Sequence, residues 1–455
     1  MKTPTKPPFT VLQLLSAFAE GNADVLGLTD DFFRKALTSG IGVTHDGRYL
    51  HWDELVRRTP PSGISREMIW AAMKLQRQIM SKPIPLEDGR KRRFTHLDAL
   101  PEPAPEILRF VDMEAGGAIS SDALLPDGDK TDRYIIKSLI EESITSSQIE
   151  GASTTRKVAA EMIRSGRRPR NRSERMIFNN YSTMQHVRTL RGEKLTPDIV
   201  FDLHRRITAG TMDEPSESGR FRRADEPVHV VEDHSGQVLY VPPPATELES
   251  RLAEMCDFAN GKTPGYYLHP VVRSIILHFW LAYDHPFVDG NGRCARSLFY
   301  WSMLRHGYWM FEYVSISRLI REAQTQYARA FLHTETDDND LTYFILYHLQ
   351  LIKRAIDDVH VYLRKKARDL ELLSSRLGDM RELNHRQRAL IVHALKKERS
   401  EYTVRSHMTL QNVTHQTARM DLYDLVRRGL LSMKKVGKTF YFHPVRDLEN
   451  RLKGS

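Results

Sequence analysis

Cysteine is almost absent from this chain of 455 residues. The two cysteines, Cys256 and Cys294, are too few for a disulfide framework or for a zinc site built on cysteine. No apolar run approaches the length of a membrane span, and the first eight residues lack the apolar stretch of a secretory signal. We therefore expect a cytoplasmic protein that does not enter a membrane. Its 40% of hydrophobic residues is sufficient for substantial cores.

Two common catalytic motifs are also missing. The sequence contains no His-Glu-x-x-His pattern, which would place two zinc-binding histidines on one helix face. Gly-Lys-Thr occurs at 261–263 and at 437–439, but a P-loop needs another glycine five residues earlier, where Cys256 and Ser432 stand. A P-loop and a His-Glu-x-x-His zinc site are therefore excluded.

One segment, His285 to Arg296, combines the residue types that phosphate chemistry requires. Its histidine is a candidate base, and its aspartate can hold Mg²⁺ together with nucleotide phosphates. Its two glycines let backbone N–H groups approach an anion, and its two arginines offer fork-shaped donors for phosphate oxygens. Singly, these residues could be caps, turns and solvated charges. Together in one turn, they predict a nucleotide-phosphate site with a base beside it.

The flanking residues predict that this turn joins two buried helices. Residues 271–283 are almost wholly apolar over three turns, and Pro286 ends that helix just after His285. Gly290 and Gly292 then form the turn, and a second helix with an apolar face follows. The phosphates would lie over the first turn of the second helix, whose positive end attracts anions.

The segment resembles the signature of the Fic family, His-Pro-Phe-x-Asp/Glu-Gly-Asn-Gly-Arg-x-x-Arg, and matches it at every fixed position. The resemblance implies a protein adenylyltransferase, which moves AMP from ATP onto a Ser, Thr or Tyr hydroxyl of another protein. It implies that His285 is the catalytic base and that Asp289 holds Mg²⁺. The implied nucleotide-binding residues are Glu150, Asp289, Gly290, Asn291, Gly292, Arg293, Arg296 and Tyr327.

A second motif lies upstream. Residues 134–149 carry a helical stripe of apolar side chains, and Gly151 ends the segment Ser146-Ser147-Gln148-Ile149-Glu150-Gly151. This resembles the inhibitory motif of a Fic subclass, Ser/Thr-x-x-x-Glu-Gly/Asn. The resemblance implies inhibitory roles for Ser146, Glu150 and Gly151, with Glu150 pairing with Arg296 and taking the guanidinium that the γ-phosphate needs. The plainer alternative is an ordinary helix end.

A hairpin is expected where the family places its target-docking flap. Val228, His229, Val230 and Val231 would form the first strand, residues 232–237 a polar turn, and residues 238–241 the second strand. The family's flap docks a target segment by strand addition. A surface hairpin without a role is the alternative. Tyr327 stands where family members place an aromatic near the base, and a core or surface tyrosine is an equal alternative.

We expect a mainly α fold with four parts. An N-terminal region of unknown role covers 1–115, and the Fic-like domain covers 130–340, with its inhibitory helix at 134–151. The small hairpin flap is the only β structure expected in this otherwise all-helical core. A helical linker at 341–378 leads to a C-terminal domain at 381–455, which resembles a winged helix-turn-helix. Six arginines crowd residues 164–175, where a solvated loop is favoured over a nucleic-acid contact.

The C-terminal domain is a candidate for DNA contact. Residues 381–455 carry 16 Lys or Arg against 7 Asp or Glu, an excess of nine that equals the formal charge of the whole chain, +9. The expected recognition helix would offer Thr414, His415, Gln416 and Arg419 to the major groove, and the wing would bring Lys434, Lys435 and Lys438 to phosphates. Winged helices also serve as protein-docking modules, so that alternative stays open.

Two classes of function remain. The first is an adenylyltransferase that uses ATP and Mg²⁺, modifies a protein substrate and is autoinhibited by Glu150. The second is a DNA-binding regulator whose Fic-like domain senses nucleotide. Within the family, transfer of UMP, phosphate or phosphocholine and removal of AMP are further chemistries that the motif does not exclude. The resemblance also allows a homodimer, and relief of inhibition by a change in association.

Overall fold

The computed structural model describes residues 3–22, 24, 29, 31, 34, 41–116, 128–226, 228–231, 236, 238–377, 383–396, 400–436, 439–448 and 451. Its helices are α1 (Val11–Ala19), α3 (Trp52–Leu55), α4 (Arg66–Met80), α5 (Ala104–Ala115), α7 (Gly128–Ile149), α8 (Arg156–Ser165), α9 (Arg172–Thr189), α10 (Pro197–Thr208), α11 (Leu248–Ala259), α12 (Pro270–Asp284), α13 (Asn291–Arg305), α14 (Ile316–Glu322), α15 (Gln324–Thr336), α16 (Thr342–Leu377), α17 (His385–Lys396), α18 (Val404–Gln411) and α19 (His415–Arg427). Its strands are β1 (Ser81–Glu87), β2 (Arg93–Leu97), β3 (Val230–Val231), β4 (Val238–Tyr240), β5 (Leu431–Val436) and β6 (Thr439–Pro444).

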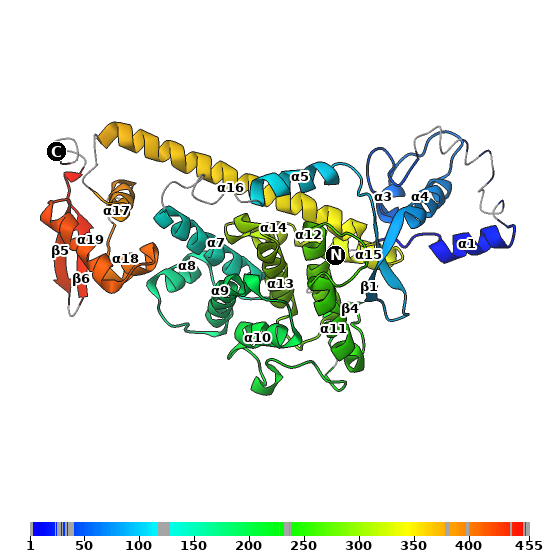
Figure 1. The fold of residues 1–455 in the computed structure, drawn as a ribbon, viewed down its shortest axis with the longest axis horizontal. Coiled ribbons are helices and arrows are strands. Elements are labelled where there is room, and N and C mark those ends of the chain that lie inside the picture. The colour runs from blue at the N-terminus through cyan, green and yellow to red at the C-terminus, as the bar shows by residue number, and fades with distance from the viewer. Residues whose placement is uncertain are drawn as a thin grey trace.

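The fold is mainly α, and the described strands pair only as three two-stranded antiparallel hairpins. Figure 1 shows a helical body in the middle of an elongated molecule, with α1, α3 and α4 at one end and α17–α19 with β5 and β6 at the other. The long helix α16 runs from the body toward the C-terminal end. Within the described residues, no helix is both long and apolar enough to cross a membrane.

The antiparallel pair α12 and α13 forms the centre of the body. Both helices are buried over nearly their whole length, and Trp280 and Trp301 have no exposed surface. Their apolar residues join one core that runs from Ile84 on β1 to Ile356 on α16. This core therefore crosses the positions near 115 and 341 at which the sequence predicted boundaries. Its continuity gives the turn between α12 and α13 a rigid base.

The helix α16 is a single helix of 36 residues, about 54 Å long at 1.5 Å per residue. No proline or glycine interrupts it between 342 and 377. Its first turns, including Phe344, Leu349 and Ile352, are buried in the core of the body. Its later turns extend beyond the body, as Figure 1 shows.

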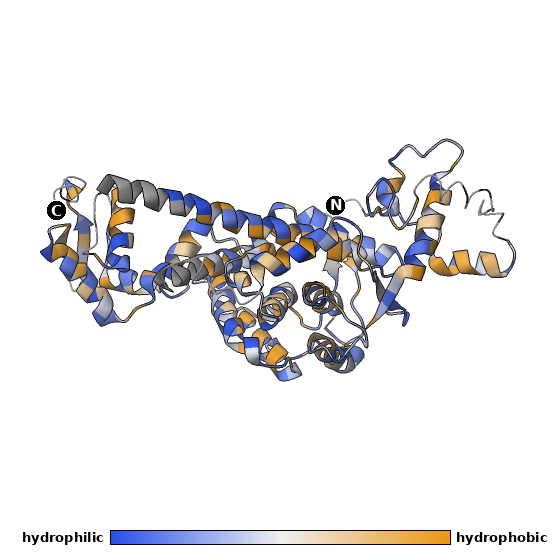
Figure 2. Ribbon diagram, turned by 45° about the horizontal axis from the view of Figure 1, so that its top comes forward, coloured by the Kyte–Doolittle hydropathy of each residue, from blue (hydrophilic) through white to orange (hydrophobic). Residues whose placement is uncertain are grey.

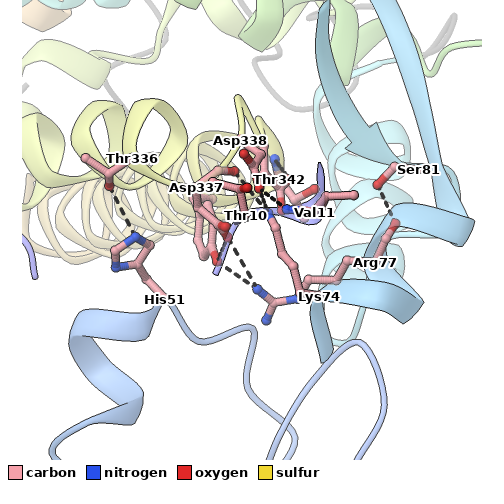
Figure 3. A network of polar contacts seen from close by, with 12 residues as sticks. Thr10, Val11, His51, Lys74, Arg77, Ser81, Thr336, Asp337, Asp338 and Thr342 are labelled. Atoms are coloured by element: carbon pink, nitrogen blue, oxygen red, sulfur yellow. Dashed lines mark hydrogen bonds and ion pairs between the residues drawn. The ribbon is translucent and has the colours of Figure 1, made fainter. Parts of the chain in front are cut away.

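The N-terminal unit, α1, α3 and α4 with the loops between them, has its own small core around Trp70. Hydrophobic residues predominate in α1 (Figure 2). A polar network joins this unit to the turn between α15 and α16 (Figure 3). There the buried Lys74 ammonium contacts both Asp337 and Asp338, and the Val11 N–H donates to Asp338 Oδ2 over 2.9 Å.

The C-terminal unit, residues 383–451, contains three helices followed by the β5–β6 hairpin, in the order that the sequence predicted. Leu390, Leu422, Leu425 and Phe442 contribute to its separate core. The buried Asp421 accepts hydrogen bonds from Asn384 and Arg386, and these bonds tie α17 to α19.

Candidate active site

The segment from His285 to Arg296 forms a tight turn between α12 and α13. His285 follows the last residue of α12 in a left-handed conformation (φ 45°), and its N–H donates to Leu281 O over 3.0 Å. Gly290 caps α13 with φ 85°, which glycine adopts without the strain that a β-carbon would bring. The turn therefore brings His285 and the first turn of α13 into one short loop.

The side chain of Asn291 closes this loop from inside. Its Oδ1 accepts from Phe287 N over 2.9 Å, and its Nδ2 donates to Phe287 O over 2.8 Å. Asn291 is 2% exposed, so its amide is committed to the loop and is not directed at a ligand. The Asn291 side chain thus holds the loop in shape, and nucleotide binding by Asn291 stays a prediction.

The cradle itself consists of backbone N–H groups. The first intrahelical bond of α13 is donated by Cys294 N to Gly290 O over 2.9 Å. The N–H groups of Asn291, Gly292 and Arg293 precede that bond and point out of the helix end. Together with the helix dipole, they create a site for an anion.

His204 on α10 fixes the loop through two hydrogen bonds, a role that the sequence did not indicate. Its Nδ1 accepts from Gly219 N over 2.8 Å, so its Nε2 carries the proton and donates to Asp289 O over 2.9 Å. Its ring stacks on Phe287 with centroids 3.8 Å apart and planes 8° from parallel. Burial lowers the pKa of His204 to about 4, so it stays neutral. The only sequence signal was one histidine on the buried face of an amphipathic helix.

The candidate base His285 is half-buried at the rim of this loop. Its Nδ1 lies 3.2 Å from Ala282 O, and because a carbonyl only accepts, Nδ1 carries the proton in that contact. The Nε2 of the neutral ring is then a free acceptor. Burial lowers the pKa of His285 below 6.5, although the nearby Glu150 and Asp289 carboxylates oppose this effect. The imidazole is therefore neutral at pH 7 and able to take a proton.

Arginine 222 fixes the backbone that carries His285. Its Nε donates to His285 O over 2.8 Å, and its own N–H donates to Pro286 O over 2.9 Å. Arg222 is 7% exposed, and burial lowers the pKa of its guanidinium. Arg222 ends the segment Gly219 to Arg222, which precedes the flap. Its hydrogen bonds therefore hold this segment directly against the turn between α12 and α13.

The two guanidiniums of the motif have different partners. Arg293 is completely buried, donates from Nη1 to Ile207 O over 3.3 Å and contacts Asp289 Oδ2 from Nη2 over 3.3 Å. Arg296 donates from Nε to Ser146 Oγ over 2.8 Å and from Nη2 to Ser146 O over 3.1 Å. The end of α7 is therefore fastened to the side chain of Arg296.

Glu150 lies directly over the anion cradle. Its Oε1 accepts from Arg296 Nη2 over 2.8 Å. A β-carbon built on Gly292 would lie 2.1 Å from the same oxygen, so the carboxylate rests against the backbone of the first turn of α13. The Glu150 carboxylate holds the pKa of Arg296 above its ordinary value, although burial of the guanidinium opposes this. A carboxylate thus occupies the place that the loop prepares for an anion.

The end of α7 permits this position. The helix begins at Gly128, before the expected Tyr134, and ends at Ile149. It is continuous because no proline or glycine interrupts residues 129–149. Gly151 has φ 91°, and Ala152 N donates to Ser147 O over 3.0 Å. The chain therefore turns away immediately after Glu150.

Tyr327 lies beside Arg296 and belongs to the aromatic packing around α12. Its hydroxyl is 3.0 Å from His278 Nε2, and burial raises its pKa. The expected flap is a short hairpin in which Val230 pairs with Tyr240 and Val231 with Val238. Val228 and His229 precede the strand, so the paired part of the flap is shorter than expected.

Asp289 is the candidate ligand for Mg²⁺. Its carboxylate is 39% exposed, and its Oδ1 accepts from Gly290 N over 2.5 Å. Among the described residues, no group of three His, Cys, Asp or Glu side chains could hold a metal ion. One accessible carboxylate beside a phosphate cradle nevertheless fits Mg²⁺, which takes its other ligands from phosphates and water.

The candidate DNA-binding residues that the structure describes lie at α19 and on β5 of the C-terminal unit. His415, Gln416 and Arg419 are exposed on α19, and Lys434 and Lys435 are exposed on β5. Thr414 caps α19, and its hydroxyl accepts from Thr417 N over 3.2 Å, so that oxygen is already engaged. Lys438 lies outside the described residues.

Comparison with known proteins assigns residues 194–303 to the Fic/DOC family model. "Protein adenylyltransferase Fic" of Nematostella vectensis is 35% identical over 118 residues, which is 26% of this chain and 25% of that protein. The protein of the same name from Drosophila willistoni is 35% identical over 133 residues, 29% of this chain and 23% of that protein. The chain thus matches about a quarter of the length of these curated relatives.

The comparison with solved structures also returned Fic proteins, with TM-scores below 0.5. A Fic family protein from Desulfovibrio desulfuricans G20 has a TM-score of 0.47 and 20% identity, covering 75% of this chain and 96% of that one. A Fic domain containing signaling protein from Bacteroides thetaiotaomicron has a TM-score of 0.44 and 19% identity, covering 55% and 95%. The segment that carries Glu150 lies outside the residues matched by the family model.

Proposed function

Because residues 194–303 form a Fic domain, we propose that this chain is a protein adenylyltransferase that Glu150 holds inactive. Curated proteins about 35% identical to this domain are named protein adenylyltransferases. The observation that carries the inhibitory part is the Glu150 carboxylate, which rests on Gly292 and binds Arg296.

The chemistry assigned to the turn is the transfer of AMP to a hydroxyl group. The hydroxyl oxygen of the target attacks the α-phosphorus of ATP, the bond from that phosphorus to the bridging β-oxygen breaks, and pyrophosphate leaves. His285 Nε2 takes the hydroxyl proton, because its Nδ1 is committed to Ala282 O and its pKa lies below neutrality. The proton thus goes to the ring of His285, whose backbone Arg222 holds through His285 O and Pro286 O.

The phosphates of ATP would take over the cradle that the carboxylate occupies. The N–H groups at the start of α13 would bind the phosphate oxygens, and Arg293 and Arg296 would bind the β- and γ-phosphates. Asp289 would hold Mg²⁺, which supplies positive charge against the triphosphate. Donors that are positioned before the substrate arrives stabilise the charge of the transition state without rearranging.

Glu150 prevents this arrangement in two ways. It places a negative charge where the γ-phosphate would lie, and it uses Nη2 of Arg296, which that phosphate needs. A carboxylate and a phosphate that occupy the same cradle would repel each other strongly in a partly buried site. ATP would therefore bind in its reactive position only when Glu150 leaves the cradle.

Intact mass spectrometry tests the proposed reaction. The Glu150→Gly variant, incubated with ATP and Mg²⁺, should gain the mass of AMP on a Ser, Thr or Tyr, and the wild-type chain should gain far less. The double variant Glu150→Gly/His285→Ala should gain none. Equal labelling of wild type and Glu150→Gly would contradict autoinhibition. If the chain instead gains the mass of UMP, phosphate or phosphocholine from the corresponding donor, that group and not AMP is the one transferred.

As a second function, we propose that the C-terminal unit contacts DNA as a winged helix. The support is the excess of nine positive charges in residues 381–455 and the exposure of Arg419, Lys434 and Lys435. A mobility-shift titration of the full chain with DNA should show binding that weakens as the salt concentration rises. The absence of a shift at low salt would contradict this proposal. A homodimer and a cytoplasmic location remain predictions of the sequence.

A further inference from the structure

Residues 164–175, which run from the end of α8 through the connection into the start of α9, carry six arginines. The arginines are Arg164, Arg167, Arg168, Arg170, Arg172 and Arg175. All of them except Arg167 are exposed. The proposed adenylyltransferase chemistry uses none of them. We call residues 164–175 the arginine segment.

Only two of these arginines have carboxylate partners within the described part of the chain. Arg167 binds the buried Glu174 with both terminal nitrogens over 2.7 Å, and Glu174 also accepts from Arg170 N over 2.8 Å. Arg172 contacts Asp213 over 2.9 Å. Among the described residues, no Asp or Glu forms an ion pair with the guanidiniums of the remaining four.

Part of the arginine segment surrounds a pocket of about 370 Å³. Arg170, Arg172 and Arg175 line it together with the turn from Gly210 to Asp213. Arg175 lies flat against Gly210, where a β-carbon would approach its Nη1 to 2.6 Å. The pocket thus combines three guanidiniums with a single exposed carboxylate. Guanidiniums are fork-shaped donors that suit phosphate oxygens.

The arginine segment is continuous with the C-terminal unit. Arg405, in the first turn of α18, donates from Nη2 to Gly166 O over 3.1 Å, and α18 packs against α8. The other end of α18 leads directly into α19, whose first turn exposes His415 and Gln416. Figure 1 shows α18 between α8 on one side and α19 with the hairpin on the other. The eight residues of α18, which lies between these two basic parts of the chain, span about 12 Å at 1.5 Å per residue.

We propose that the arginine segment and the exposed face of α19 and β5 form one surface for double-stranded nucleic acid. This inference rests on the proposed DNA contact of the C-terminal unit and extends it onto the catalytic body. A duplex that lies on α19 and β5 continues along α18 and places backbone phosphates at Arg168, Arg170 and Arg175. The contacts are with phosphate, so they add affinity without reading sequence. The length of α18, about 12 Å, corresponds to about four base pairs at 3.4 Å each.

The test is a fluorescence-anisotropy titration of a labelled duplex with the full chain at several salt concentrations. The loop variant is Arg168→Ala/Arg170→Ala/Arg175→Ala, and the tail variant is Lys434→Ala/Lys435→Ala. A control variant, Arg90→Ala/Arg109→Ala/Arg321→Ala, removes the same charge from exposed arginines elsewhere. Each phosphate contact contributes about 0.9 to the slope of log K against log salt. The loop variant should therefore lower that slope by about 2.7, and the control variant should leave it nearly unchanged.

Duplex length gives a second readout. The affinity of the loop variant should stop rising once the duplex reaches a certain length. The affinity of the wild type should continue to rise over about four further base pairs. If the tail variant loses binding while the loop variant and control behave alike, this extension is wrong and the tail contact stands. If the wild type binds no duplex at low salt, both proposals fail. Tighter, arginine-dependent binding of polyglutamate than of duplex would overturn the inference in favour of an acidic protein partner.

Discussion

The close approach of Glu150 to Gly292 makes a quantitative prediction about Gly292→Ala. The added methyl group would lie 2.1 Å from Glu150 Oε1, whereas ordinary contacts begin near 3.4 Å, so the carboxylate must move by about 1.3 Å. Its hydrogen bond to Arg296, now 2.8 Å long, cannot survive that movement. A hydrogen bond to a charged group stabilises by about 1.5–3 kcal/mol, and alanine in place of helical glycine returns up to about 1 kcal/mol. The net loss should be about 1–2 kcal/mol.

The double variant isolates the contact. In the Glu150→Gly background, no carboxylate remains for the methyl group to displace, so Gly292→Ala should be neutral or stabilising by up to about 1 kcal/mol. The coupling energy between the two positions should then be about 1.5–3 kcal/mol. Glu141→Gln is a suitable control, because Glu141 lies on the same helix but pairs with Arg156.

Thermal unfolding monitored by tryptophan fluorescence measures these differences. The five tryptophans lie between residues 52 and 309, so none reports on the C-terminal unit. A loss of 1–2 kcal/mol corresponds to a fall of about 2–8 °C in the midpoint. If Gly292→Ala costs the same in both backgrounds, the carboxylate does not rest on Gly292 in solution. ATP should also fail to stabilise the double variant, because the methyl group lies in the phosphate cradle.

Three further changes test the supports of the site. The transfer rate of the Glu150→Gly variant should be constant above pH 7 and fall only well below 6.5, since burial lowers the pKa of His285 and removal of the nearby carboxylate lowers it further; an inflection above 6.5 would contradict this. His204→Phe keeps the stacking on Phe287 but loses two hydrogen bonds, so kcat/KM for ATP should fall about 10- to 100-fold, and an unchanged value would rule out its positioning role. Lys74→Met should destabilise the N-terminal unit by about 3 kcal/mol and speed its proteolysis without changing AMP transfer in the Glu150→Gly background, whereas the exposed Lys82→Met should do neither.

The shape of the motif loop could be predicted because its contacts are local. Pro286 ends one helix, Gly290 provides the left-handed residue, and Asn291 bonds back to Phe287 four residues earlier. Each depends on backbone geometry within a few residues. The inward commitment of the Asn291 side chain was nevertheless missed, because residue type does not reveal which way an amide points.

In the C-terminal unit, too, the local elements could be predicted from the sequence and a distant contact could not. The periodicity of its apolar residues was sufficient to predict three helices and a hairpin, since each segment buries one face. It meets the body where α18 packs against α7 and α8, and there Arg405 donates to the carbonyl of Gly166. Polar surface residues carry no periodic signal, so such a contact could not be predicted.

By itself, the sequence determined the residues of the phosphate turn, the helices on either side and the resemblance that links them to AMP transfer. Only the tertiary structure decided where the distant partners lie. Glu150 is 146 residues from Arg296, and His204 is 85 residues from Asp289, so packing of α7 and α10 against α13 brings each pair together. Hydrophobic burial aligns those helices, and it depends on the whole core, whereas a turn depends only on its own residues.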